Sequence, residues 1–331
     1  MNDGSATNNL ATATTTIAIA PSVKNDFNGD QLSDLLFQDM PPPDNTGGRG
    51  HGSGDPNAGT PQIWLYNGTS PTSQVTLPNP GASWQIVGTG DFNGDGDADI
   101  VWQNTDGTPL IWTMNGTSVT GVTMLPDPGA SWHLVGTGDF NNDGNSDLVF
   151  QNTVDGTPLI WMMNATSVAS SATLGAVGAT TRIVGTGDFN GDGKSDLLFQ
   201  AADGTPVIWT MNGSIITAGV ALPNPGATTR VVGMGDFDGD GKSDLLLQAS
   251  DGTPVIWTVS GTTLTAGVAL PNPGPTWQAI GTDDFNGDGK ADILFQSTID
   301  GSPLIWTTNN LTVATSTILP SFGLNYHANT G

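Results

Sequence analysis

The sequence predicts an all-β protein, a β-propeller of four-stranded antiparallel blades, six in number, with seven as the alternative. Two markers recur along the 331 residues with one period. The Trp of an apolar run returns every 48 or 49 residues, at Trp64, Trp112, Trp161, Trp209, Trp257 and Trp306. An Asp-rich motif precedes each of them, beginning at Asp26, Asp91, Asp139, Asp188, Asp236 and Asp284. The composition agrees, since all 31 acidic residues are Asp and the 46 Gly and 22 Pro favour tight turns between strands.

Each repeat contains four strand patterns. In residues 82–125 they are "SWQIVGTG", "ADIVWQN", "PLIWTM" and "SVTGVTML", separated by the Asp-rich loop, an Asp-Gly turn and "NGT". Asp-Gly between apolar runs is a strong hairpin signal. Apolar residues fall on both parities of the second and third strands, as Ile100 and Trp102 alternate with Val101. Both faces are therefore expected to be buried, as they are in blades that stack on two neighbours.

The chain is predicted to be a single domain, 1–331, with repeats near 21–80, 81–128, 129–177, 178–225, 226–273 and 274–320. Gln38 and Trp64 are 26 positions apart where Gln103 and Trp112 are 9 apart, so seventeen extra residues lie in a loop insertion at 39–61. Arg49 and His51 in this loop make it a candidate binding loop, although Gly- and Pro-rich insertions are often mobile decoration.

The C-terminal segment 321–331 resembles a first strand of a blade. It is predicted to complete the first blade and to close the ring non-covalently. A seventh, composite blade made from both chain ends is the alternative.

The Asp-rich loop has the side chains of a Ca²⁺ site at its positions 1, 3, 5 and 9, and a turn Gly at position 6 that directs the carbonyl of position 7 inward. Oxygen ligands with several carboxylates and no His or Cys select Ca²⁺ over softer-ligand metals. An EF-hand is excluded because its position 12 is Glu, where these loops have an apolar strand residue. The predicted ligands at positions 1, 3, 5, 7 and 9 are Asp26, Asn28, Asp30, Leu32 and Asp34; Asp91, Asn93, Asp95, Asp97 and Asp99; Asp139, Asn141, Asp143, Asn145 and Asp147; Asp188, Asn190, Asp192, Lys194 and Asp196; Asp236, Asp238, Asp240, Lys242 and Asp244; Asp284, Asn286, Asp288, Lys290 and Asp292.

Asp, Asn and Gly also make good turns without a metal. Three carboxylates in one loop repel each other unless a cation neutralises them, however, and the pattern occurs six times. We therefore expect about one structural Ca²⁺ per repeat. The first site is expected to be the weakest, because Gln31 replaces the turn Gly and Leu32 occupies position 7.

Charge and composition exclude several classes of function. A formal charge of -24 repels nucleic acid and anionic lipid. No stretch approaches the roughly 20 apolar residues that a membrane helix needs, so membrane insertion is not expected. With no Cys, no Ser/His/Asp arrangement and no pair of Glu residues, the chain is not expected to be an enzyme.

The start of the first strand is the predicted ligand-binding position. It is aromatic in some repeats and Thr in others, which indicates an edge rather than a uniform core. An aromatic platform beside polar donors suits the stacking of sugars, although a partly exposed strand end without a ligand explains the pattern too. The candidate residues are Trp84, Gln85, Trp132, His133, Arg182, Arg230, Trp277, Gln278, Tyr326 and His327.

The motif "DFNGDGKSD" followed by a strand, in tandem copies from about residue 20 to the end, resembles the FG-GAP/VCBS repeat. That repeat occurs in the propellers of integrin α-subunits, in secreted bacterial proteins, and in PVL-like and bacterial fucose-binding lectins. The resemblance implies a propeller with structural Ca²⁺ in these loops, and the lectin members imply sugar sites between blades. We therefore expect a secreted, calcium-stabilised propeller that binds glycans as a lectin or adhesion module. The alternatives are an integrin-like scaffold for a protein ligand and a non-catalytic propeller of a larger secreted protein.

Overall fold

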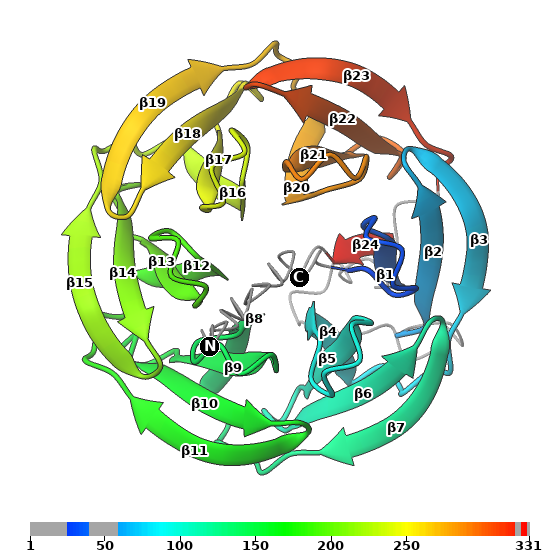
Figure 1. Ribbon diagram of the computed structural model, residues 1–331, viewed down its shortest axis with the longest axis vertical. Helices are drawn as coiled ribbons and strands as arrows, with labels where there is room; N and C mark the ends of the chain where they lie inside the picture. The colour runs from blue at the N-terminus through cyan, green and yellow to red at the C-terminus, as the bar shows by residue number, and fades with distance from the viewer. Residues whose placement is uncertain (1–24, 40–58, 322–325, 330–331) are drawn as a thin grey trace, which may run out of the picture.

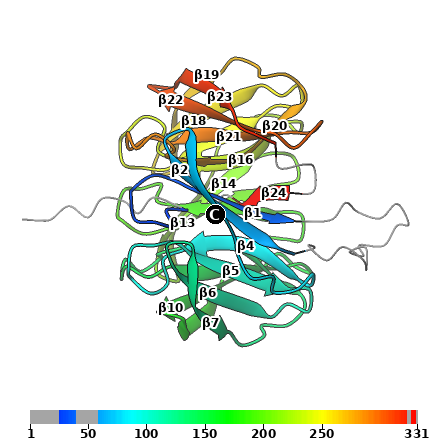
Figure 2. The same ribbon diagram turned by 90° about the vertical axis from the view of Figure 1, so that its right-hand side faces the viewer.

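The computed structural model describes residues 25–39, 59–321 and 326–329. These residues form six four-stranded antiparallel sheets arranged as blades around a central axis (Figure 1). Seen from the side, the blades form a thick disc (Figure 2). The predicted six-bladed propeller is confirmed, and the seven-bladed alternative is wrong for the described residues. No helix in this part of the chain is long and apolar enough to cross a membrane.

Each blade after the first is a meander of four consecutive strands, with the first strand innermost and the fourth outermost. Blade one contains β1 (Leu35–Asp39), β2 (Pro61–Asn67), β3 (Ser70–Thr76) and β24 (Tyr326–Asn329). Blade two contains β4 (Trp84–Gly90), β5 (Asp99–Asn104), β6 (Pro109–Asn115) and β7 (Ser118–Met124). Blade three contains β8 (Trp132–Gly138), β9 (Asp147–Asn152), β10 (Pro158–Asn164) and β11 (Ser167–Thr173). Blade four contains β12 (Arg182–Gly187), β13 (Asp196–Gln200), β14 (Pro206–Asn212) and β15 (Ile215–Ala221). Blade five contains β16 (Arg230–Gly235), β17 (Asp244–Gln248), β18 (Pro254–Ser260) and β19 (Thr263–Ala269). Blade six contains β20 (Trp277–Asp283), β21 (Asp292–Ser297), β22 (Pro303–Asn309) and β23 (Thr312–Ile318).

The C-terminal strand closes the ring as predicted. Strand β24 pairs antiparallel with β1, with Asn329 opposite Leu36 and Tyr326 opposite Asp39. The sheet order of blade one is therefore β24-β1-β2-β3. The loop insertion lies between β1 and β2, and most of it, with Arg49 and His51, falls outside the described residues, as does the N-terminal segment.

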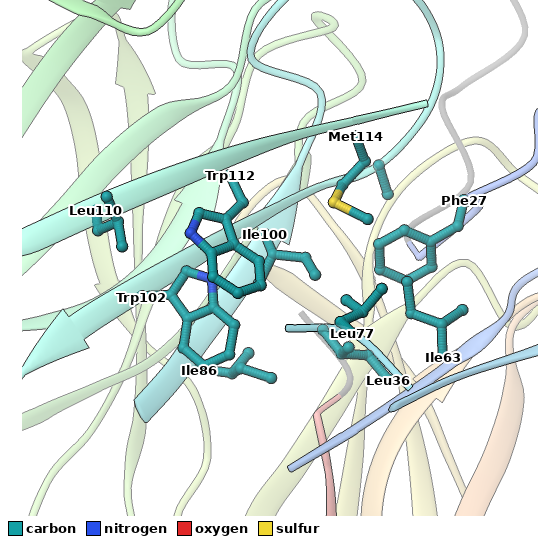
Figure 3. Packing of buried hydrophobic residues seen from close by; sticks show 11 residues of the cluster. Phe27, Leu36, Ile63, Leu77, Ile86, Ile100, Trp102, Leu110, Trp112 and Met114 are labelled. Carbon is teal, nitrogen blue, oxygen red and sulfur yellow. The ribbon is translucent and has the colours of Figure 1, made fainter. Parts of the chain in front are cut away.

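The hydrophobic core is divided among the seams between neighbouring blades. At the seam of blades one and two, Phe27, Leu36 and Ile63 of one blade pack against Trp102 and Trp112 of the next (Figure 3). The rings of Trp102 and Trp112 are tilted by 55° with centroids 4.8 Å apart. A Phe at position 2 of every Asp-rich loop is fully buried, at Phe27, Phe92, Phe140, Phe189, Phe237 and Phe285.

In blades one to five, a Gln near the end of the second strand joins neighbouring blades through its side-chain amide. Gln103 Nε2 donates to the carbonyls of Gly107 and Trp132, both at 3.0 Å, and its Oε1 accepts from the N–H of Leu134 at 3.0 Å. The same three hydrogen bonds recur at Gln38, Gln151, Gln200 and Gln248. Each Gln spans a seam and satisfies backbone groups of two blades, so it fixes the position of one blade on the next.

Candidate metal centre

The six Asp-rich loops connect the first and second strands of the blades, and each curls around its first Asp. In the second loop, Asp91 Oδ1 accepts from the N–H of Gly94 at 2.6 Å and Oδ2 accepts from that of Gly96 at 2.9 Å. Asp95 Oδ1 accepts from the N–H two residues further on, at 3.0 Å. The two Gly residues have φ of +75° and +91°, a left-handed conformation that favours Gly. The turn geometry therefore follows from the sequence pattern.

The first loop keeps this geometry without the turn Gly. Gln31 adopts φ +66° at position 6, and its N–H donates to Asp26 Oδ2 at 2.8 Å, as the N–H of Gly96 does to Asp91. The substitution thus places a side chain in a conformation that Gly adopts more easily, while the loop stays curled. Its expected weaker affinity for a metal stays a prediction.

The Asp at position 9 is the most buried acidic residue of each loop. Asp99 is fully buried, and its two carboxylate oxygens accept the N–H of Phe92 at 2.9 Å and of Met114 at 2.8 Å. This carboxylate therefore links the loop to the third strand of its own blade, a second role that the sequence pattern alone did not reveal. The same pair of hydrogen bonds occurs at Asp34, Asp147, Asp196, Asp244 and Asp292.

Burial raises the pKa of all six position-9 carboxyls, in spite of the backbone N–H groups that lower it. Neighbouring Asp residues of the same loop raise the pKa further. The resulting values are about 6 for Asp99 and Asp147, about 7 for Asp34, Asp196 and Asp244, and about 8 for Asp292. Without a cation, these carboxyls hold protons at a pH at which an ordinary Asp has lost its own.

The fifth loop brings three carboxylates together. Asp236, Asp238 and Asp244 each place an oxygen within 4.8 Å of the others. In the other loops position 3 is Asn, so that the third oxygen is a neutral amide oxygen. This acidic triad could bind a metal ion, and its all-oxygen donors fit Ca²⁺ best.

The Lys residues at position 7 differ in their contacts. Lys242 Nζ lies 2.8 Å from Asp240 Oδ2 and brings a positive charge into the fifth loop. Lys290 instead donates to the side-chain oxygens of Asn309 and Asn310, and Lys194 to that of Asn212, in the turn between the third and fourth strands. Such contacts place this turn beside the metal loop, and we call their common side of the disc the metal-loop rim.

The six loops are also joined to one another. The N–H at position 8 of each loop donates to the backbone carbonyl of the first Asp in the preceding loop, as Ser146 does to Asp91 at 2.7 Å. The series runs around the ring and ends with the N–H of Ser33 and the carbonyl of Asp284, at 3.0 Å. A cation that stiffens one loop therefore acts on the seam with the next blade as well.

The candidate ligand-binding residues lie on the opposite rim, where the connections between blades run. Trp84, Trp132 and Trp277 are half-buried and pack against the apolar clusters of three different seams. Of the polar residues beside them, Gln85 is half-buried, whereas His133, Arg182, Arg230 and Gln278 are exposed. The backbones of Tyr326 and His327 pair with Asp39 and Gln38. The structure thus distributes these residues around the ring, one pair to a blade, and does not gather them into one site.

Comparison with known proteins agrees with this architecture. FG-GAP-like repeats match residues 26–102, 91–150, 188–247 and 236–295, which together exceed half of the chain. No curated protein sequence matches it. Among solved structures, a Tc holotoxin pore of Photorhabdus luminescens is similar, with a TM-score of 0.55 and 20% identity over 91% of this chain, which spans 14% of that toxin chain.

Two further structures resemble the chain less. BBS1N in complex with ARL6DN has a TM-score of 0.45 and 12% identity, covering 78% of this chain and 73% of the other. The C-terminal WD40 domain of Sif2 has a TM-score of 0.40 and 15% identity, covering 75% of each chain. The repeats, the six blades and the loop geometry lead to one assignment: the chain belongs to the family of FG-GAP-like repeat proteins.

Proposed function

We propose that the chain is a secreted binding module, not an enzyme, and that its six loops hold structural Ca²⁺ ions. The observation that carries the metal proposal is the triad of Asp236, Asp238 and Asp244 in a loop whose pattern occurs six times. Bringing three carboxylates so close costs electrostatic free energy that a divalent cation removes. Around the ion, positions 1, 3, 5 and 9 would supply side-chain oxygens.

Bound Ca²⁺ neutralises the loop and holds the turn between the first two strands of a blade. The position-9 carboxylate already accepts hydrogen bonds from the third strand, as Asp244 does from Val259 at 2.9 Å. The backbone carbonyl of position 1 accepts one from the next blade. A cation in the loop would therefore stabilise both the blade and the seam.

Thermal unfolding in excess Ca²⁺ and in EDTA tests the metal proposal. With Kd about 1 mM, as in other extracellular modules, 10 mM Ca²⁺ stabilises each site by about 1.4 kcal/mol, or six sites by about 8 kcal/mol. A chain of this length then melts about 12 °C higher. Calorimetric titration should give about six Ca²⁺ per chain, and Mg²⁺ at the same concentration is the control. Equal melting temperatures in Ca²⁺ and EDTA would contradict the proposal.

We further propose that the opposite rim binds carbohydrate. Half-buried indoles beside exposed polar side chains support this, as Trp132 lies next to His133 and Trp277 next to Gln278. An indole offers a face for a sugar ring to stack on, and the exposed polar side chains of the same rim offer hydrogen bonds to sugar hydroxyls. Because the positions repeat around a ring, weak single sites would act together on a glycan-covered surface.

A glycan array in Ca²⁺ buffer tests this second proposal. Each Trp also packs on a core cluster, so its removal alone would confuse binding with stability. His133→Ala and Gln278→Ala are cleaner probes, because both side chains are exposed. We expect them to weaken glycan signals while the melting temperature stays the same, and an exposed residue of the metal-loop rim, Asn115→Ala, is the matched control. A blank array with the wild-type chain contradicts carbohydrate binding.

A further inference from the structure

The seam between blades three and four contains a cavity of about 270 Å³. It opens on the opposite rim, where the connection from β11 enters β12. We call it the blade-four pocket, and it is lined by Ala176, Val177, Thr181, Phe199, Val207 and Trp209.

Comparison with the preceding seam explains why the cavity exists. Thr181 stands where blade three has Trp132. That indole packs against a cluster that includes Phe150, Leu159 and Trp161. Their counterparts in blade four are Phe199, Val207 and Trp209, so two side chains are smaller here, Thr in place of Trp and Val in place of Leu. Blade four therefore has the same two aromatic residues, Phe199 and Trp209, but lacks the indole that packs on their counterparts in blade three.

The connection above the pocket leaves the same space open. In the turn before blade three, a Cβ added at Gly129 would lie 3.8 Å from Trp132 Cδ1, and before blade six the distance from Gly274 to Trp277 Cδ1 is 4.0 Å. At the equivalent Gly178, no heavy atom lies within 4 Å. The same gap occurs at Gly81, before Trp84, so the open space in this seam is given by the cavity itself and not by the turn.

The aromatic residue behind this space is correspondingly uncovered. Trp161 and Trp306 are 7% and 6% exposed, whereas the equivalent Trp209 is only half-buried. Trp257 of blade five is half-buried as well, and Trp209 packs against the cluster of its own seam with part of its ring exposed. Its ring lies against Phe199 with centroids 4.6 Å apart and a tilt of 58°. The pocket thus presents the ring of Trp209, with the Phe199 ring, which is 1% exposed, behind it.

We propose that the blade-four pocket binds a small aromatic compound with a planar ring system of about the size of indole, in the place of the missing Trp side chain. The cavity volume of about 270 Å³ lies just below the range of about 300–1,000 Å³ of sites for drug-sized ligands, so the pocket can hold a single ring system. A ring in this position would contact the partly exposed ring of Trp209 in the tilted geometry that aromatic pairs prefer.

The lining distinguishes this ligand from a sugar. Apart from the Thr181 hydroxyl and the indole N–H of Trp209, its side chains are apolar. The hydroxyls of a buried sugar would lose hydrogen bonds to water there without replacing them. A protein partner is also disfavoured, because the neighbours Thr180 and Arg182 are exposed and polar and provide no apolar surround for an anchor residue. The proposal is independent of carbohydrate binding and of Ca²⁺ binding.

Titration of the full chain with indole, followed by calorimetry and by saturation-transfer NMR of the ligand, tests the proposal. Thr181→Trp supplies the missing indole from the protein itself and should abolish binding without lowering the melting temperature. Arg182→Trp is the matched control: successive side chains of a strand point to opposite faces, so it adds an indole on the other side of β12 and should leave binding unchanged.

Two further variants keep the test decisive if Thr181→Trp does not fold. Val207→Leu restores the residue type of blade three and should weaken indole binding, because it narrows the pocket. Trp132→Thr combined with Leu159→Val should open an equivalent pocket in blade three and add one bound indole per chain. The proposal is overturned if indole does not bind the wild-type chain, if it binds Thr181→Trp equally well, or if methyl glucoside displaces it from the wild-type chain.

Discussion

Replacing Gln103 by Leu tests whether the amide that spans a seam stabilises the ring. Gln103 is 8% exposed, and its three hydrogen bonds are all 3.0 Å long. The register between β8 and β9 shifts just after Leu134, whose N–H donates to the Gln103 side chain. Leu at position 103 therefore leaves this N–H and the carbonyl of Gly107 without these partners in a buried seam.

Each buried backbone group that loses its partner costs about 1–3 kcal/mol, and burial of the added methyl groups returns part of this. We expect a net loss of about 3 kcal/mol. With an unfolding entropy of about 2.1 cal/mol/K per residue, a chain of 331 residues melts about 4 °C lower.

The assay is calorimetric melting in excess Ca²⁺, so that the metal loops stay loaded. Gln85→Leu is the matched control, because Gln85 lies directly opposite Gln103 on β4 and is half-buried. It should change the melting temperature by less than about 1 °C. Since distant sites act independently, adding Gln200→Leu should double the loss. A Gln103→Leu protein that melts with the wild type would refute the reasoning.

Three other predictions concern the metal loops and one turn. Asp196→Asn should lower the free energy of unfolding by about 2 kcal/mol in EDTA, because its amide nitrogen would face the backbone N–H of Phe189 or of Met211, and by more in Ca²⁺, because it also removes a charged ligand of the ion. Asp192→Asn should lower it in Ca²⁺ alone, and melts under both conditions separate the two roles. In EDTA, the folded chain binds more protons than the unfolded one between pH 4 and 8, since burial raises the position-9 pKa to about 6–8 from about 3.9 in an unfolded chain. The free energy of unfolding in EDTA should therefore fall as pH rises through that window. The increase in melting temperature on adding Ca²⁺, measured at pH 5 and pH 8, should be larger at pH 8. A smaller increase at pH 8 would contradict the raised pKa of the position-9 carboxyls. Gly156→Ala should cost more than about 2 kcal/mol in urea unfolding, because φ is +76° and the new methyl group meets the Gly178 carbonyl, whereas Gly241→Ala, with φ +80° and open space, should cost about 1 kcal/mol. Equal costs at the two Gly positions would show that the contact with Gly178 is unimportant.

Most of the fold was predictable because the repeat is long and regular. The spacing of Trp112 and its counterparts located each blade, and the likeness of the C-terminal segment to a first strand predicted its pairing with β1. The loop pattern likewise predicted where carboxylates gather, as at Asp236, Asp238 and Asp244.

The contacts across seams were not predictable, because periodicity along one strand does not show what the next blade places opposite. Gln103 stands in the strand pattern as one polar residue, and its partner Trp132 is 29 positions away in another blade. Variation between Trp132 and Thr181 indicated an edge, whereas the structure shows a half-buried indole in one seam and a cavity in the next. That difference appears only when both sides of a seam are in place.

The pairing of β24 with β1 also determines how the ring responds to mechanical force. The chain enters β1 beside Leu36, and it leaves β24 at Asn329, which is the partner of Leu36 in the register. Tension applied through the two ends of the chain therefore acts on the same end of this strand pair. Under that geometry the backbone hydrogen bonds break one after another, from Leu36 towards Asp39, instead of all being sheared together. A molecule held at both ends would thus lose the pairing of β24 with β1 by unzipping, after the buried contacts of Asn25 and Phe27 in the preceding loop are broken.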